Sequence, residues 1–455
     1  MSTKNALSSA NSLCLIILFL INIASSQSYY ESAIGSSFDA YSAHSFALSS
    51  SSQIAETSGY ALFFNPSNLS RDNDVGFLIS GTNFIDSRFE RRGLIVKDSF
   101  GDFLTESDYV KNSSLFNFNS IGIKFNKIIL NDFNIGLGAS FAPYKSYNFT
   151  YEEEVRGQLS SNDGQIFSRD PLLGYHIFKS KGVQYLLGVG SSVSWEIDQI
   201  RGSFGFSYNS ILSSDIEESA HIDTSLLIGI IVTEDSNELS SLPSYDINYT
   251  LNNSNFLTIG SSIIYDQYLF SFSFQNSATI RKEVSDESIL DSLSASYGSN
   301  ELGINLLTFH NSLKTSDIEI PEKINFGFSI LDKENGGYSF IINYEFNKYD
   351  KSSFLESYER FGLGIEHYTI NNIPLRFSIG YRTSEFKPYI SSISSFSCGS
   401  GMKFKKITFD YGIRYRHIRY SYPDLFPVEG EFRPDLDVIN DSRIILLGTL
   451  TYSFK

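Results

Sequence analysis

Residues 441–455, at the end of the chain, read DSRIILLGTLTYSFK. Successive side chains of a strand point to opposite faces, so one face of this stretch would carry Ile444, Leu446, Gly448, Leu450, Tyr452 and Phe454. The other face would carry Arg443, Ile445, Leu447, Thr449, Thr451, Ser453 and Lys455. A strand with one apolar and aromatic face that ends in an aromatic-x-aromatic pattern is typical of the strand that closes a membrane β-barrel.

The same two-residue alternation recurs from about residue 76 onward, in pairs of strands joined by short turns. The clearest hairpins cover residues 120–141, 324–346, 361–382 and 396–420. Longer polar stretches separate the hairpins, at residues 158–170, 236–248, 285–299 and 422–441. Short turns at one rim and long loops at the other are the layout of outer-membrane barrels.

The face assignments agree from strand to strand. In residues 338–346, 375–382 and 407–415, aliphatic and aromatic side chains share one face, and no charged side chain lies on it. This separation is expected in a membrane, because Arg or Lys facing midplane lipid costs roughly 2–4 kcal/mol. A soluble β-sandwich also alternates, but it does not favour such long, aromatic-faced strands. We predict an all-β fold, a transmembrane antiparallel up-and-down β-barrel of about 14 strands, with 16 possible.

The amino-terminal end has the features of an export signal. Lys4 and a polar stretch precede an apolar run at residues 13–23, and the small residues Ala24-Ser25-Ser26 follow it. The run is too short to span a membrane as a helix, and no later run reaches about 18 apolar residues, which excludes a helical membrane protein. We expect a signal peptide at residues 1–26, a hatch at 27–70 and the barrel at 71–455.

Composition restricts the function classes. The chain has 35 Lys and Arg against 51 Asp and Glu, and its net charge of −16 disfavours nucleic acid as a partner. Once the signal peptide with Cys14 is removed, Cys398 is the single cysteine, so no internal disulfide can form. The sequence has no phosphate-binding glycine loop, no histidines at metal spacing and no nucleophile elbow. We therefore predict no catalytic residue, no cofactor and no metal site.

Residues 39–69 differ from the barrel strands because they are rich in Ser and Ala and lack a two-residue period. We interpret them as one or two short helices followed by a turn at Asn65-Pro66, folded into the barrel lumen as a plug. A flexible amino-terminal extension is the alternative. Phe63, Phe64, Asn65 and Pro66 are the candidate hatch and ligand residues.

This segment also carries a resemblance to a known family. Residues 42–48 (SAHSFAL), Ala55 and residues 60–69 (YALFFNPSNL) resemble the amino-terminal hatch of the long-chain fatty-acid transporter superfamily, where a small-residue helix precedes an Asn-Pro-Ala-x-Leu motif. The resemblance continues in the same order through residues 135–144, 272–281, 320–327, 360–381 and 409–411. It implies a plugged barrel in the bacterial outer membrane that moves hydrophobic molecules such as long-chain fatty acids passively, with membrane lipid and a hydrophobic ligand as partners.

Some residues depart from the family pattern, and they bear on the substrate more than on the fold. Serines stand at residues 49–52 where many members carry glycines, Ser67 replaces the usual Ala, and Trp195 is the only tryptophan. The superfamily also contains lipid-binding barrels and accessory barrels of a protein-secretion machine in Bacteroidota-like bacteria. The resemblance therefore implies an alternative function, a non-transporting barrel that binds lipid or a secretion-system partner protein. An enzyme such as a lipase is the least favoured function.

Charged residues on inward strand faces form a second set of candidates: Glu366, Arg376, Arg382, Asp410, Arg414 and Arg416. Such groups are costly inside a barrel unless they pair or meet water. They either form a network that fills the lumen and holds the hatch, or leave one arginine to receive a carboxylate headgroup, for which its planar fork is suited.

Pro143 lies within the expected strand at residues 132–149, where its missing N–H removes a ladder hydrogen bond and restricts it to an edge or a bulge. A defect that faces lipid could act as a side opening from the lumen into the bilayer. The alternative is that Pro143 lies above the membrane, where the strand enters its outer loop.

Overall fold

The computed structural model describes residues 29–49, 52–71, 76–130, 133–156, 172–223, 244–286, 301–331, 338–350, 354–370, 372–387, 389–390, 392–426 and 436–454. The signal peptide predicted at residues 1–26 and the polar stretch at 158–170 lie outside the described residues, as do parts of the stretches at 236–248, 285–299 and 422–441. None of the helices in the described ranges is long and apolar enough to cross a membrane.

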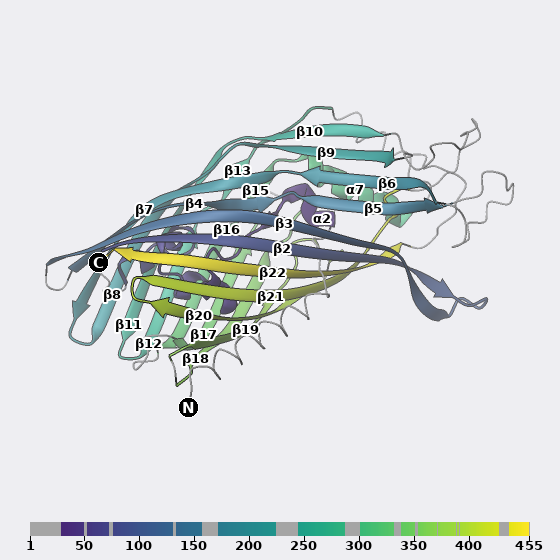
Figure 1. The fold of residues 1–455 in the computed structure, drawn as a ribbon. Helices are drawn as coiled ribbons and strands as arrows, with labels where there is room; N and C mark the ends of the chain where they lie inside the picture. Colours follow the sequence, from purple (N-terminus) through teal and green to yellow (C-terminus); the bar gives the residue numbers. More distant parts are fainter. Residues whose placement is uncertain are drawn as a thin grey trace.

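Fourteen antiparallel strands form a closed ring, which confirms the predicted fold class (Figure 1). In ring order they are β4 (Phe133–Ser146), β3 (Phe103–Leu130), β2 (Gly76–Lys97), β22 (Asp437–Phe454), β21 (Ile407–Tyr422), β20 (Ile393–Phe404), β19 (Pro374–Arg382), β18 (Tyr358–Tyr368), β17 (Tyr338–Lys348), β16 (Glu322–Leu331), β12 (Tyr268–Gln275), β11 (Ser254–Tyr265), β8 (Ile200–Ile211) and β7 (Val183–Ile197). The pairing of β7 with β4 completes the ring.

The carboxyl-terminal strand closes the barrel against the first barrel strand, as its sequence predicts. β22 pairs with β2 from Phe454 opposite Phe77 to Val438 opposite Gly93. Leu450, Tyr452 and Phe454 are exposed on the outer face, whereas the intervening inward side chains are more enclosed. The same division of faces holds in the first part of β21, where Phe409, Tyr411 and Tyr415 are exposed and Asp410 and Arg414 are buried.

Short turns lie at the end of the barrel that holds the carboxyl terminus. Four of them contain a non-glycine residue in the left-handed backbone region: Asp198, Asp266, Asn372 and Lys405. Asn and Asp tolerate this conformation because their short polar side chains bond locally, and it matches the twist of a tight hairpin. These turns connect β7 to β8, β11 to β12, β18 to β19 and β20 to β21.

A second sheet extends the wall at the opposite end of the molecule (Figure 1). Its strands are β14 (Lys282–Val284), β10 (Tyr245–Leu251), β9 (Ser214–Asp223), β6 (Leu172–Lys181) and β5 (Phe149–Arg156). A two-stranded sheet, β13 (Ala278–Ile280) with β15 (Ile318–Ile320), and the helix α7 (Glu301–Thr315) lie at the same end.

Two features of this end correct the sequence interpretation. The polar stretch assigned to residues 236–248 is wrong for its last residues, because β10 begins at Tyr245 and buries Ile247, Tyr249 and Leu251 on one face. The helix α7 was not predicted at all. In both places a short apolar pattern lies beside Ser- and Asn-rich sequence, which hides it from a window of average length.

The amino-terminal segment folds inside the barrel, which confirms the predicted helical hatch in the lumen. Its elements are α2 (Tyr29–Ile34), β1 (Ser36–Ser37), α3 (Ala43–Ala47), α4 (Ser52–Ala55), the 3-10 helix η2 (Gly59–Phe63) and α5 (Asn68–Arg71). The helices are more numerous than expected and very short. Ser42 and Ser58 begin two of them, because each side chain accepts a hydrogen bond from the backbone N–H two or three residues later.

Candidate functional site

The hatch lies against inward-facing glycines of the barrel wall. A Cβ atom added to Gly260 would lie 1.9 Å from Asn65 Oδ1, and one added to Gly205 would lie 2.6 Å from the Pro66 carbonyl carbon. Similar conflicts below 3 Å would arise at Gly136 and Gly138 with Leu69, Gly188 with Phe63, Gly190 with Leu62, Gly327 with Ile54, Gly380 with Ser49, and Gly399 with Ala47. Wall and hatch are therefore in contact on most sides of the lumen, with no room for a methyl group at these positions.

Asn65 and Pro66, two of the predicted hatch residues, fix the hatch in this seat. Asn65 is fully buried, and its Nδ2 donates a hydrogen bond to Ser271 Oγ on β12 at 2.7 Å. Asn65 Oδ1 accepts hydrogen bonds from the Ser67 backbone N–H at 3.1 Å and from the Ser67 hydroxyl at 2.7 Å. The serine that departs from the family motif thus adds one bond to the turn that holds the hatch.

The other two predicted hatch residues form an aromatic cluster above the seat. Phe63 packs edge-to-face on Tyr41 with ring centroids 5.1 Å apart, and Phe64 lies 5.6 Å from the same ring. Phe64 also lines a small cavity with Lys323 and Arg360. At this part of the hatch, the aromatic ring of Phe64 therefore lies beside the charged side chains of Lys323 and Arg360.

The structure brings together three of the predicted lumen charges, which lie on β18, β19 and β21. Arg376 lies between two carboxylates, with Nε 2.5 Å from Glu366 Oε2 and Nη1 2.7 Å from Asp410 Oδ1. His44 of the hatch approaches the same Glu366 oxygen at 3.4 Å. Because both carboxylates are occupied by Arg376, this group joins the wall strands and anchors helix α3 of the hatch.

The remaining predicted arginines line a second site. Arg414 contacts both oxygens of Asp39, each at 2.8 Å, and Arg416 contacts Glu31 at 3.2 Å. Both carboxylates belong to the hatch. Arg382 instead pairs with Glu385, three residues further along the chain. The charges that were predicted as one network therefore form two groups, one at Arg376 and one around Asp39.

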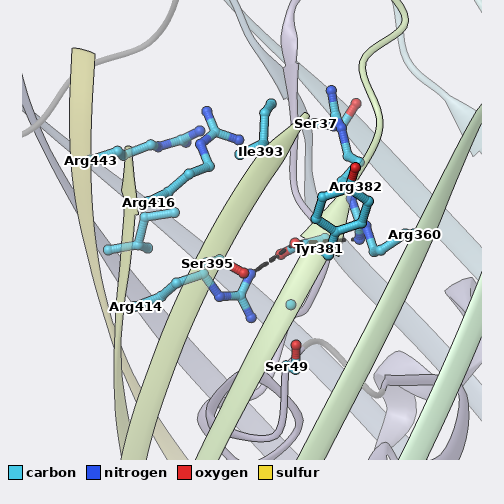
Figure 2. A pocket seen from close by; sticks show the side chains of 13 residues that line it. Ser37, Ser49, Arg360, Tyr381, Arg382, Ile393, Ser395, Arg414, Arg416 and Arg443 are labelled. Carbon is cyan, nitrogen blue, oxygen red and sulfur yellow. Dashed lines mark hydrogen bonds and ion pairs between the residues drawn. The ribbon is translucent and has the colours of Figure 1, made fainter. Parts of the chain in front are cut away.

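Five arginines face the cavity at Asp39: Arg360, Arg382, Arg414, Arg416 and Arg443 (Figure 2). Its volume of about 60 Å³ admits a few water molecules and is too small for an acyl chain. Asp39 is the only carboxylate among the described lining residues, and it is shared by Arg414 and Arg360, the latter at 3.3 Å.

Sequence reasoning missed four participants in this group: Glu31, Asp39, Arg360 and Arg443. The alternation places Arg443 on the inward face, and Arg360 lies on an inward face by the same rule, so both could have been included. Glu31 and Asp39 lie in irregular hatch sequence, where no periodicity indicates direction.

The barrel wall is interrupted between β3 and β4. Their ladder runs from Leu130 opposite Phe133 to Ile121 opposite Phe141 and then stops, although β3 continues to Phe103. Among the described residues, no strand pairs with this edge of β3 over residues 113–120. Contact resumes further out, where the Glu152 backbone N–H donates to Asn112 Oδ1 at 3.0 Å.

The hatch takes the place that β3 leaves on β4. Strand β1 pairs with the freed edge of β4, with Ser36 opposite Ser146 and Ser37 opposite Lys145. Lys145 Nζ also donates to the Ile34 carbonyl oxygen at 2.7 Å. Backbone groups at the end of β4 thus find hydrogen-bonding partners in the hatch after β4 separates from β3.

Aromatic side chains lie on the lumen side of the break. Phe38, just after β1, packs edge-to-face on Phe84 at 5.5 Å and on Phe118 at 5.1 Å. The guanidinium of Arg88 lies 4.7 Å from the centre of the Phe116 ring, and its Nη1 donates to the Asn148 carbonyl oxygen at 2.6 Å. The break is therefore filled by apolar side chains and held by one arginine, rather than being an open hole.

Pro143 lies two residues beyond the last β3–β4 pair. The register between β4 and β7 shifts between Pro143 and Lys145, which is the kind of bulge where a strand accommodates a residue without an N–H. β4 ends at Ser146, so the long strand expected at residues 132–149 is divided before Phe149.

No protein-family model matches the sequence, and no curated protein sequence is significantly similar to it. Among solved structures, a FadL homologue from Pseudomonas aeruginosa is similar over 92% of this chain and 100% of its own length, with a TM-score of 0.55 and 11% identity. The Pseudomonas putida toluene transporter TodX gives 0.48 and 12% identity, over 91% and 99% of the two chains. The described chain thus has the fold of the FadL homologue, as the sequence resemblance predicted.

Proposed function

We propose that this protein lies in the bacterial outer membrane and passes hydrophobic molecules, such as long-chain fatty acids, passively through its barrel and out through the break between β3 and β4. One observation carries the proposal. The hatch seals the lumen against a ring of glycines, while the wall above that seal lacks its ladder over residues 113–120. For a molecule that enters the lumen at the end opposite the short turns, the hatch would block the path along the barrel axis. A side path lined by aromatic residues would remain.

The outer surface supports a membrane location. Aromatic and aliphatic side chains are exposed around the ring, and the inward side chains carry the charges. The similarity to the FadL homologue supports the same location. In a bilayer, a break in the wall opens toward hydrocarbon, so an apolar molecule that leaves there needs no polar exit. In this proposal the bulge at Pro143 turns β4 away from β3.

The arginine cavity supplies a place for a carboxylate headgroup. Arg360 and Arg414 share Asp39, so an incoming carboxylate can take over one of these two guanidiniums without leaving a carboxylate unpaired. Asp39 follows β1 by two residues. Binding at this point would disturb the hatch segment that holds β4 inward, and would link occupancy to the break.

Uptake by cells tests this proposal. The protein is expressed in a bacterial host that lacks its own fatty-acid transporter, and uptake of radiolabelled oleate is measured together with entry of a small hydrophilic solute. We expect oleate uptake above the empty host and no increase in solute entry. Absence of oleate uptake, or an equal rise in both, would overturn the proposal.

A protruding hairpin supports a second candidate function, an accessory barrel with a protein partner. β2 and β3 continue as a two-stranded arm beyond the last β2–β22 pair (Figure 1). Its tip exposes 90% of Phe100, 65% of Phe103 and 59% of Leu104. Stoichiometric co-purification of a protein that is lost in a Phe100→Ser, Phe103→Ser variant would favour this function over transport.

A further inference from the structure

Three asparagines lie together on the outer face of β2 and β3. Asn83 Nδ2 donates to Asn117 Oδ1 at 2.7 Å and to Asn119 Oδ1 at 3.0 Å. Asn83 and Asn119 are opposite each other in the ladder, and Asn117 is two residues further along β3. Among the described residues, the hydrogen bonds of these amides join the three asparagines to one another and to no other outward side chain.

The cluster interrupts an apolar row. The outward residues of β3 run Phe125, Ile123, Ile121, Asn119, Asn117 and Leu115, and Leu115 and Ile121 are exposed on either side of the pair of asparagines. On β2 the corresponding row places Ile79 and Gly81 on one side of Asn83 and Ile85 on the other. The amides thus interrupt apolar rows on both strands, within the band that the proposed function assigns to lipid.

Some amide N–H donors of this asparagine cluster have no acceptor among the described residues. An asparagine side chain has two N–H donors, and those of Asn83 are used. The amide nitrogens of Asn117 and Asn119 remain, with four N–H groups, and no described residue accepts a hydrogen bond from them. An unbonded amide in hydrocarbon costs several kcal/mol, so a purely structural role would favour Leu or Val at these positions.

The cluster lies at the edge of the break. The β3–β4 ladder ends at Ile121, and Asn119 and Asn117 are the next two outward residues on the unpaired edge of β3. On the lumen side of the same strand segment are Phe116 and Phe118. The break therefore has an aromatic inner side and an amide-bearing outer lip.

We propose that Asn83, Asn117 and Asn119 form an exit subsite that binds the carboxylate or hydroxyl headgroup of an amphipathic molecule as it leaves through the break. The free N–H groups suit a carboxylate, and Asn83 Oδ1 can accept from a protonated acid or an alcohol. The apolar tail would meanwhile lie against the outer surface of the wall. This inference rests on the proposed lateral exit and adds a residue-specific site to it.

The test compares two probes that differ only in the headgroup. Uptake of oleate and of (Z)-octadec-9-ene, in which a methyl group replaces the carboxylate, is measured in the transporter-deficient host for the wild type and for the Asn117→Leu, Asn119→Leu variant. The matched control is Asn255→Leu, an exposed outward asparagine on β11, where the ladder to β8 is intact. Heat-modifiable mobility on a gel verifies folding, and Asn117→Ala, Asn119→Ala replaces the leucine variant if that one fails to fold.

We expect oleate uptake to fall about tenfold in the double variant, as loss of hydrogen bonds to a charged group predicts, and octadecene uptake to stay within about twofold. Asn255→Leu should leave both rates unchanged. An equal fall for both probes, or no fall for either, overturns the subsite. If wild-type protein takes up neither probe, the proposed function itself fails.

A resident lipid is the other source of a polar headgroup at this lip. Mass spectrometry of the purified protein separates the two sources. We expect no phospholipid that is retained by the wild type and lost in the double variant. Such a lipid would mean that the asparagines hold a membrane component permanently, and it would overturn the exit role.

Discussion

The two edges of the β2–β3 pair differ sharply. On one side, β2 joins β22 through 17 successive residue pairs without a register shift. On the other side, β3 joins β4 through nine pairs and separates after Ile121 and Phe141. All four strands carry the same alternation of inward and outward side chains. Beyond Phe141, β4 pairs with hatch strand β1 in place of β3, whereas no hatch strand pairs with β22 among the described residues.

The comparison distinguishes two kinds of contact: the long ladder between β2 and β22, which closes the barrel, and the short pairing of hatch strand β1 with β4, which lies at the break. Closure uses long ladders, whose backbone hydrogen bonds cannot be replaced by water in a membrane. At the break, two hatch residues, Ser36 and Ser37, pair with the edge that β4 exposes, whereas no described strand pairs with this edge of β3 over residues 113–120. The hatch thus packs against the glycine ring and also pairs with the β4 edge that β3 leaves.

Removal of residues 452–455 tests the closed edge and should have the largest effect. The deletion takes away Tyr452 and Phe454 together with the end of the β2–β22 ladder. We expect assembly to be abolished, with no heat-modifiable species and no protein in the membrane fraction. Removal of Lys455 alone is the control and should assemble normally. Normal insertion of the larger truncation would contradict the role of this strand.

Deletion of residues 42–69 tests the seal. This segment contributes no pairing to the ring of barrel strands, so a folded, heat-modifiable barrel should remain. Ion conductance in planar bilayers should rise at least about tenfold, because an empty lumen of a 14-stranded barrel is wide enough for water. Loss of the folded form would show that the hatch is required for the wall. Unchanged conductance would show that it is not the seal.

Two glycine substitutions separate the seal from the outer surface. Gly260→Ala drives a methyl group into Asn65, whereas Gly81 on β2 has nothing within 4 Å of an added Cβ. We expect Gly260→Ala to lower the free energy of unfolding by roughly 1–3 kcal/mol and to increase conductance. Gly81→Ala should change neither. Equal urea midpoints for the two variants would argue against a tightly seated hatch.

The bulge in β4 gives a smaller effect. Pro143→Ala restores an N–H at the point where the register with β7 shifts. We expect oleate uptake to fall by about twofold if the alanine lets β4 straighten toward β3. If uptake is unchanged in this variant while the hatch deletion alters it, Pro143 does not shape the exit.

The smallest effect concerns the second, five-stranded sheet, away from the break. Burial of His176 on β6 lowers its pKa to about 4, and neither ring nitrogen has a hydrogen-bond partner among the described residues. The unfolded chain therefore binds more protons than the folded one between pH 6.5 and 4, and stability falls as pH falls through this range. His176→Phe, which keeps the stacking on Phe426, should flatten the decrease in Tm between pH 7 and 5. An equal decrease would exclude His176 as its source.

The strands could be predicted from the sequence because alternation is a local property. It identified the closing strand, the outward face of β21 and the inward direction of Arg376, Asp410 and Arg414. The break could not be predicted in this way, because it depends on which of two partners β4 takes, and the two residues of β1 carry no pattern. Asp39 was missed for the same reason, since its role appears only when the hatch is folded against Arg414 and Arg360.

The path of the ligand is the central claim, and photo-crosslinking measures it most directly. An oleate analogue with a diazirine in its tail is supplied to cells that express the protein, and adducts are mapped by mass spectrometry after irradiation. The account predicts adducts at Phe38, Phe84 and residues 113–120, on both sides of the break. Adducts at Asn65 and Pro66 and on the turn at Asp266, without labelling of residues 113–120, would mean that the ligand passes through the hatch and would contradict it.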